Sequence, residues 1–378
     1  MKKGLVLLAA ASGMVLAGCT SQSADGTISV ESSNDACKLS ATSAPAGNVT
    51  FSVKNTGSQV TEFYILASDG LQVVSEVENI GPGITRELVT QLTQGDYFSS
   101  CKPGMKGDGI RAPFKVTAST ASPSVNADTA KLLQQATANY VAYVQDQSQQ
   151  LLVQTEKFAT AFAAGDTAQA KALYAQTRMH YERIEPVAES FGDLDPKLDL
   201  RETDLEKGQV WTGWHRAEKD LWPPAGYTPM TQAQRQQLAD ELVADTKQLN
   251  TKVQNLTLTP AQLANGAKGL LDEVATSKVT GEAEKWSHTD LYDFQANVEG
   301  ARIAFRVLEP VVQQKNPQLA TQINEKFASL QTLLDKYKTQ DGGYVTYDQL
   351  TPEQVKELSA AVDALSEPLS KLTTTVVN

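Results

Sequence analysis

The stretch "NADTAKLLQQATANYVAYVQDQSQQLLVQTEKFATAFAAG" (126–165) decides the fold class of the larger part of this sequence. Its apolar residues recur at steps of three and four, and it ends on Gly165. This period is that of an amphipathic helix with a glycine stop. The pattern predicts one long helix that must bury one face against other helices.

Capping signals predict further helices after this one. Asp166-Thr167 can cap a helix that runs toward Ser190. Thr259-Pro260 and Thr351-Pro352 each combine an N-cap threonine with a first-turn proline. We therefore expect about six to eight helices in an all-α bundle domain over residues 128–378.

Residues 27–118 follow a different period. "NVTFSVKN" places Val49, Phe51 and Val53 on one face, which is the alternation of a strand. Further candidate strands are "TEFYILA", "LQVVSEV", "ITRELVTQL" and "PFKVTA", separated by turn residues. Short strands at this spacing predict a β-sandwich. The small, polar segment 119–127, "STASPSVNA", is typical of a linker between the two domains.

The N-terminus reads as an export signal. "MKKGLVLLAAASGMVLAGCT" combines two lysines, an apolar run and small residues before Cys19. "LAGC" resembles a bacterial lipobox, which implies a signal peptide at 1–18, acylation of Cys19 and a lipidated tether at 19–26. The alternative is a signal peptide with an incidental cysteine. The lipobox reading predicts an extracytoplasmic protein that is lipid-anchored to the cell membrane.

The remaining cysteines and the net charge narrow the function. Lipidation of Cys19 leaves Cys37 and Cys101, and an even pair in an oxidising compartment predicts a disulfide. Free thiols or copper ligands are the alternative. The net charge of −11 argues against nucleic acid as a partner and fits cation binding, although a solvated acidic surface is the commoner explanation.

Carboxylates and two of the three histidines gather between residues 178 and 220. His215 and Glu218 are three residues apart, as are Glu182 and Glu185, so each pair can share a helical face. Helical proteins build carboxylate–imidazole metal sites from two such pairs, and Asp199 can add an oxygen. A solvated surface is the alternative. A buried cleft is favoured by the three tryptophans nearby, Trp211, Trp214 and Trp222.

The segment "WSHTDLYDFQANVEGARIAF" (286–305) is a further candidate. It contains His288, Asp290 and Glu299 within an amphipathic helical pattern. No carboxylate follows His288 at a spacing of three or four residues, so a helix-start residue is favoured over a functional group.

The β half resembles a cupredoxin in the order of "ACK", "VTEFYIL", "EVENIGPGITREL" and "GDYFSSCKPGM". Blue copper requires two histidines and a thiolate, and the first histidine of the chain is His180, beyond this half. A type-1 copper centre is therefore not expected. A metal site with oxygen ligands is the remaining possibility, and its candidates are Glu62, Glu76, Glu78 and Asp96. The alternative is that these residues are ordinary carboxylates of strand edges and turns.

The whole chain resembles the EfeO family of iron-uptake lipoproteins, which join a cupredoxin-like domain to an imelysin-like helical domain. The resemblance is carried by "HYERIEPVAESFGDLDPKLDLRE", "GWHRAEKDLW" and "SHTDLYDFQANVEGA", in this order. It implies iron binding, as Fe2+ or Fe3+, and delivery to a membrane ferric permease alongside a dye-decolorising haem peroxidase. It also implies a metal site formed by Glu182, Glu185, Asp199, His215 and Glu218, with Asp290 and Glu299 as additional candidates.

Two other functions are weighed against iron transport. The imelysin name suggests a metallopeptidase, but the chain has no H-E-x-x-H motif. Some relatives are described as binding anionic polysaccharide. One imidazole with four carboxylates is a hard ligand set that suits iron, although Zn2+ or Cu2+ can compete in vitro. We therefore expect a binding protein without catalysis of its own.

Overall fold

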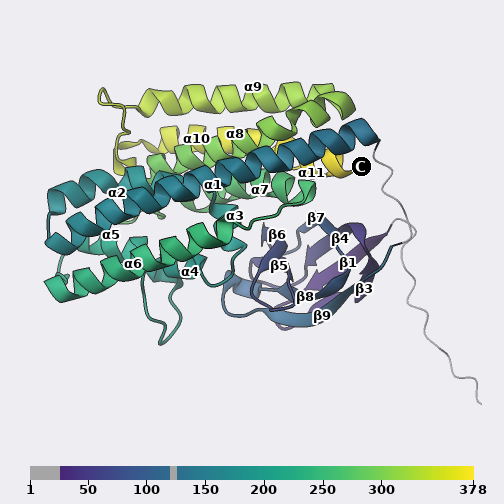
Figure 1. Ribbon diagram of the computed structural model, residues 1–378, viewed down its shortest axis with the longest axis horizontal. Coiled ribbons are helices and arrows are strands. Elements are labelled where there is room, and N and C mark those ends of the chain that lie inside the picture. Colours follow the sequence, from purple (N-terminus) through teal and green to yellow (C-terminus); the bar gives the residue numbers. More distant parts are fainter. Residues whose placement is uncertain (1–25, 120–125) are drawn as a thin grey trace, which may run out of the picture.

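The computed structural model describes residues 26–119 and 126–378. It consists of an N-terminal β-sandwich and a C-terminal helical domain, which confirms the predicted fold class (Figure 1). The predicted signal peptide, Cys19 and most of the predicted linker lie outside the described residues. Among the described residues, no helix has the length and apolar character needed to cross a bilayer.

The sandwich is formed by two sheets. Their orders are β2-β1-β4-β7 and β3-β9-β8-β5-β6, and β1 runs parallel to β4. The inward faces meet in an aromatic core in which the ring of Phe51 lies 5.2 Å from Phe63 and 5.5 Å from Phe114. The strands are β1 (Thr27–Ser32), β2 (Cys37–Leu39), β3 (Ser43–Pro45), β4 (Gly47–Asn55), β5 (Thr61–Leu66), β6 (Val73–Ile80), β7 (Thr85–Leu92), β8 (Gly95–Cys101) and β9 (Ile110–Thr117).

The helical domain has eleven α-helices within residues 126–378, more than the number expected. The excess comes from short helices, which lack a full period in the sequence. The helices are α1 (Ala127–Ala164), α2 (Thr167–Glu182), α3 (Glu185–Glu189), α4 (Asp195–Leu198), α5 (Trp214–Leu221), α6 (Gln232–Val253), α7 (Pro260–Glu273), α8 (Asp290–Lys315), α9 (Pro317–Leu334), α10 (Pro352–Leu369) and α11 (Leu372–Val377).

The caps of these helices explain where they begin and end. Thr259 and Thr351 each form a capping box with the glutamine three residues later. Gly165 ends α1 in the left-handed conformation, with φ 75°. The helix expected from Asp166 toward Ser190 is broken after Glu182, because Pro186 has no N–H to donate to the Glu182 carbonyl and its ring would collide with that carbonyl in a continuous helix.

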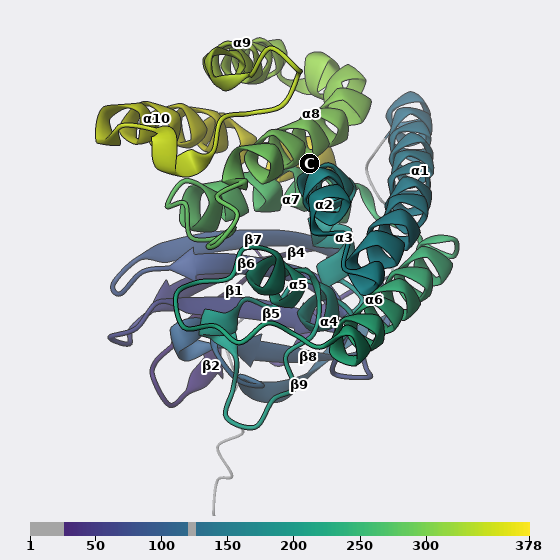
Figure 2. The ribbon, with the colours of Figure 1, turned by 90° about the vertical axis from the view of Figure 1, so that its left-hand side faces the viewer.

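Helix α7 joins the two domains. It lies against β6 and β7, the edge strands of the two sheets, on the side of the sandwich that faces the helices (Figures 1 and 2). The Gln262 side-chain amide donates to the Val74 carbonyl at 3.1 Å, and the Asn265 amide donates to the Val89 carbonyl at 2.9 Å. Edge strands have unpaired backbone groups, and α7 supplies partners for some of them.

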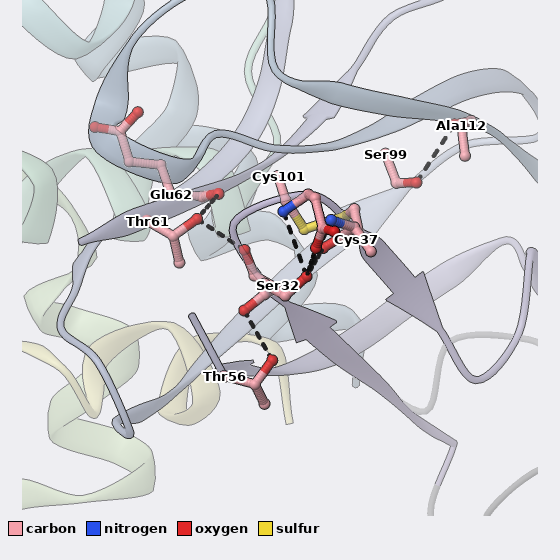
Figure 3. Close-up of a disulfide and its surroundings, with 11 residues drawn as sticks. Ser32, Cys37, Thr56, Thr61, Glu62, Ser99, Cys101 and Ala112 are labelled. Atoms are coloured by element: carbon pink, nitrogen blue, oxygen red, sulfur yellow. Dashed lines mark hydrogen bonds between the residues drawn. A yellow bond between two sulfur atoms is a disulfide. The ribbon is translucent and has the colours of Figure 1, made fainter. Parts of the chain in front are cut away.

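A disulfide links the two sheets of the sandwich. Cys37 on β2 and Cys101 on β8 are bonded, and their Cα atoms are 5.5 Å apart (Figure 3). Close by, the hydroxyls of Ser32 and Thr61 form a second link between the sheets at 2.8 Å (Figure 3). Cys101 is fully buried. In this structure both thiols are therefore used in the cross-link.

Replacement of both Cys37 and Cys101 by alanine should destabilise the sandwich. The bond closes a loop with a sequence separation of 64, which corresponds to about 4 kcal/mol of unfolding free energy in the chain-entropy model. Denaturant unfolding of the parent and the double variant measures the difference. A reducing agent should lower the stability of the parent and leave that of the double variant unchanged; equal stability of the two proteins would contradict the prediction.

Candidate metal site

The first part of the candidate site lies where α2 ends. Glu182 is the last residue of α2 and Glu185 the first of α3, so they do not share one helical face as expected. The break nevertheless leaves both carboxylates close together: the Asn297 amide on α8 contacts Glu182 Oε2 at 3.2 Å and Glu185 Oε2 at 3.0 Å. Both glutamates are buried.

The second part lies at the start of α5. Gly213 has φ 83°, and a Cβ there would collide with the Leu198 carbonyl, so a glycine is required where α5 meets the end of α4. This close approach brings His215 Nε2 to 3.6 Å from Asp199 Oδ1. One turn later, Glu218 Oε2 lies 3.3 Å from His215 Nδ1. Trp214 is fully buried and packs on Phe158 with 4.8 Å between ring centroids, which anchors the helix.

The third part is the irregular segment before α8, and it contributes a residue that the sequence did not reveal. Glu284 is fully buried, and its Oε1 lies 3.8 Å from His215 Nδ1. The backbone N–H groups of Trp286 and Ser287 donate to Glu218 Oε1 at 2.9 and 2.7 Å. Glu284 follows no helical or strand period, so no pattern singled it out; its position just ahead of the "WSHTD" motif was the available signal.

The five residues predicted as ligands lie in one region, as two groups. Within each group one possible ligand atom per residue lies within 4.8 Å of the others. The first group is His215, Glu218 and Glu284, and the second is Glu182, Glu185 and Asp199. The six residues come from four separate stretches of the chain: 182–185, 199, 215–218 and 284.

Asp290 and Glu299, the additional candidates, lie outside the two groups, as do His288 and Asp220. Asp290 is buried and its Oδ1 accepts the backbone N–H of Glu284 at 3.1 Å, so it supports the segment that carries Glu284. Glu299 pairs with Arg183 at 2.8 Å, outside both groups. His288 adopts φ 57° in the turn before α8, and its carbonyl accepts the Tyr347 N–H. Asp220 is held by Arg235 at 2.6 Å and caps the Met230 N–H.

Two buried cations lie among these carboxylates. Arg178 has no solvent exposure and forms ion pairs with four carboxylates: Glu182, Asp199, Glu284 and Asp293. Lys278, which is 3% exposed, places Nζ 3.1 Å from Glu182 Oε2 and 3.8 Å from Glu185 Oε1. Buried carboxylates need such partners because isolated charges are very costly away from water.

The candidate ligands differ in the direction in which their surroundings shift their pKa values. Burial opposes the charge on His215, but Asp199 beside it raises the pKa of the imidazole to about 9. Burial also opposes the charge on Asp199, yet Arg178 and His215 hold the pKa of this carboxyl well below its usual range. Burial and then Glu218 raise the pKa of Glu284 to about 7. Burial and then Glu182 raise the pKa of Glu185.

The carboxylates proposed for a second site separate into two places. Glu62, Glu76 and Glu78 line a cavity of about 600 Å³ between the domains, together with Asp195 and Glu273 of the helical domain. Removal from water, and then Glu62, raise the pKa of Glu76 to about 8. Asp96 lies apart from this cavity and forms an exposed pair with Lys115 at 2.9 Å, because the β8 register places it opposite that lysine.

Both domains of the chain are similar to known protein families. A model described as Imelysin matches residues 136–372, and a model of a cupredoxin-like domain matches residues 5–112. The chain is 38% identical over 341 residues to "Iron uptake system component EfeO" of Escherichia coli (strain K12), covering 89% of this chain and 88% of that protein. Proteins of the same name from Shigella flexneri and Shigella sonnei match with the same identity and coverage.

Replacement of Glu218 by alanine should loosen the segment that carries Glu284. The variant removes the acceptor of the Trp286 and Ser287 N–H groups, and each hydrogen bond to a charged group contributes about 1.5–3 kcal/mol. Amide hydrogen exchange of residues 284–289, followed by mass spectrometry, should accelerate at least about tenfold. Glu299→Ala is the control and should leave this exchange unchanged; unaltered exchange in Glu218→Ala would refute the anchoring role.

Proposed function

We propose that this chain, which belongs to the EfeO family of iron uptake system components, captures iron in its helical domain and hands it to a membrane iron permease. The membership rests on the identity and coverage just given and on the imelysin and cupredoxin-like matches. Iron is here the cargo of the protein, so the site must both bind the ion and let it go.

The observation that carries this proposal is the convergence of His215 with buried carboxylates from separate segments. Carboxylate and imidazole ligands suit iron and manganese, whereas structural zinc prefers cysteine and histidine. Neighbouring groups also hold the candidate ligands: Glu218 accepts two backbone N–H groups, and the Asn297 amide donates to Glu182 and Glu185. Such outer contacts hold metal ligands in place.

A binding role agrees better with the relatives than a catalytic one. The imelysin family carries a peptidase name, but the full-length relatives are named as iron uptake components. His215 and Glu218 form an H-x-x-E pair, and the second histidine of a zincin helix is absent from the sequence. Hydrolysis of a peptide by the metal-loaded protein would favour the enzyme instead.

The N-terminus supports a place outside the cytoplasm. We propose that Cys19 carries a lipid that tethers the protein beside the permease, and that a haem peroxidase of the dye-decolorising class works in the same system. The motif "LAGC" after the apolar run supports the anchor. Labelling with a radioactive fatty acid, lost on Cys19→Ala, tests it.

Replacement of His215 by alanine, or of Glu218 by glutamine, should weaken iron binding by at least about tenfold, because either change removes a ligand. Calorimetric titration of the two-domain protein with Fe2+ under anaerobic conditions measures the affinity. His180→Gln is the matched control, because His180 contacts Gln147 at 2.9 Å and lies outside both ligand groups. Equal affinity of His215→Ala and the parent would show that the site is elsewhere.

Metal affinity should rise with pH between about pH 6 and pH 8, by about tenfold per unit for each displaced proton. The pKa of His215 is about 9, so the metal-free imidazole is protonated over this range and its proton must leave before the metal binds. Glu284, with a pKa of about 7, releases a further proton in the lower part of the range. Titration with Mn2+ avoids ferric hydrolysis; a pH-independent affinity would contradict the ligand set.

A further inference from the structure

We propose that Lys278 is a resident cation of the metal site, whose ammonium group neutralises Glu182 and Glu185 when iron is absent and moves aside when iron binds. This inference rests on the iron-binding function proposed above and concerns how the site releases its cargo. It assigns a role to a residue that supplies no ligand atom to a cation.

Lys278 forms ion pairs with two candidate ligands. Its Nζ lies 3.1 Å from Glu182 and 3.8 Å from Glu185, and all three side chains are buried. These two glutamates and Asp199 offer ligand oxygens within 4.8 Å of one another. A metal ion held by the Glu182–Glu185 pair would therefore lie beside the ammonium, and the two positive charges would repel strongly in a site with little water.

Arg178 is less suited to move. Its guanidinium contacts Glu182, Asp199, Glu284 and Asp293 at once, and its planar fork binds in fixed directions. Lys278 instead carries a compact charge at the end of a flexible four-carbon stem. Lys278 is also the last residue of the π-helical turn η3 (Val274–Lys278), which follows α7, and π turns are uncommon and frequently occur at functional sites.

An exchange of cations explains reversible binding. If iron left and no cation took its place, the Glu182–Glu185 pair would keep only the ion pair between Arg178 and Glu182 as compensation, and this cost would favour the iron-bound state. The return of the ammonium to Glu182 and Glu185 supplies the missing charge, so that iron can leave. Conversely, the Lys278 ammonium must leave Glu182 and Glu185 before iron binds, which lowers the apparent affinity for iron.

The test compares neutral replacements of Lys278 with a matched control. Lys278→Met removes the charge and keeps the length, and Lys278→Gln keeps a hydrogen-bond donor. Both should bind Fe2+ and Mn2+ at least about tenfold more tightly than the parent, because the competing charge is gone, and both should release the metal to a chelator more slowly. Lys268→Met, which removes a lysine paired with Asp272 on α7, makes the same change in net charge and should bind as the parent does.

The outcomes separate this proposal from the function on which it rests. Absence of metal binding by the parent and by all variants rejects both. Binding by the parent with equal or weaker binding by Lys278→Met and Lys278→Gln rejects the resident cation alone, since a structural counter-ion would lower affinity when lost. Failure of both neutral variants to fold likewise assigns Lys278 a structural role and overturns the proposal. Tighter binding and slower release in either folded variant support it.

Discussion

The burial of Arg178 is the constraint on which the helical domain depends. A guanidinium without solvent exposure is tolerated when carboxylates surround it, and here they come from the end of α2, the segment after α4, the turn before α8 and α8 itself. These ion pairs connect segments that are far apart in the sequence. Three of these carboxylates, Glu182, Asp199 and Glu284, are also candidate ligands. The charges that stabilise the fold are therefore also charges of the metal site.

This balance leaves a role for a metal ion. Six carboxyl groups, those of Glu182, Glu185, Asp199, Glu218, Glu284 and Asp293, face Arg178, Lys278 and the imidazolium of His215. Burial and neighbouring carboxylates raise the pKa values of Glu185, Glu284 and Asp293. Protonation of these groups therefore reduces the excess of negative charge. A metal ion can replace these protons and stabilise the folded state by mass action.

One helix connects this site with the second acidic region. Helix α7 lies against the edge strands of the sandwich, ends at Glu273 on the cavity between the domains, and continues into the turn that ends at Lys278. The carboxylates of β5 and β6 predicted as a second site therefore lie close to the helical domain. The two acidic regions share a structural element even though they belong to different domains.

The sequence alone determined the features that depend on neighbours along the chain. Helical period and caps identified α1, α7 and α10, alternation of Val49, Phe51 and Val53 identified a strand of the sandwich, and the even pair of cysteines predicted the disulfide that the structure contains. The H-x-x-E spacing placed His215 and Glu218 on one face of α5. These properties follow from geometry within one or two turns, so a local pattern records them.

Tertiary structure alone decided which charges meet. The break at Ile184 separates Glu182 and Glu185 onto two helices. Glu284 comes from an irregular turn and Lys278 from the end of a π-helical turn, and neither has the period of an α-helix or a strand. Asp96 has the same chemistry as Glu76, yet it pairs with Lys115 while Glu76 faces the cavity between the domains. Local patterns indicate which face of a helix or strand a residue occupies. Its partner depends on how distant segments pack, and because buried charges are costly, only packing that pairs them is stable.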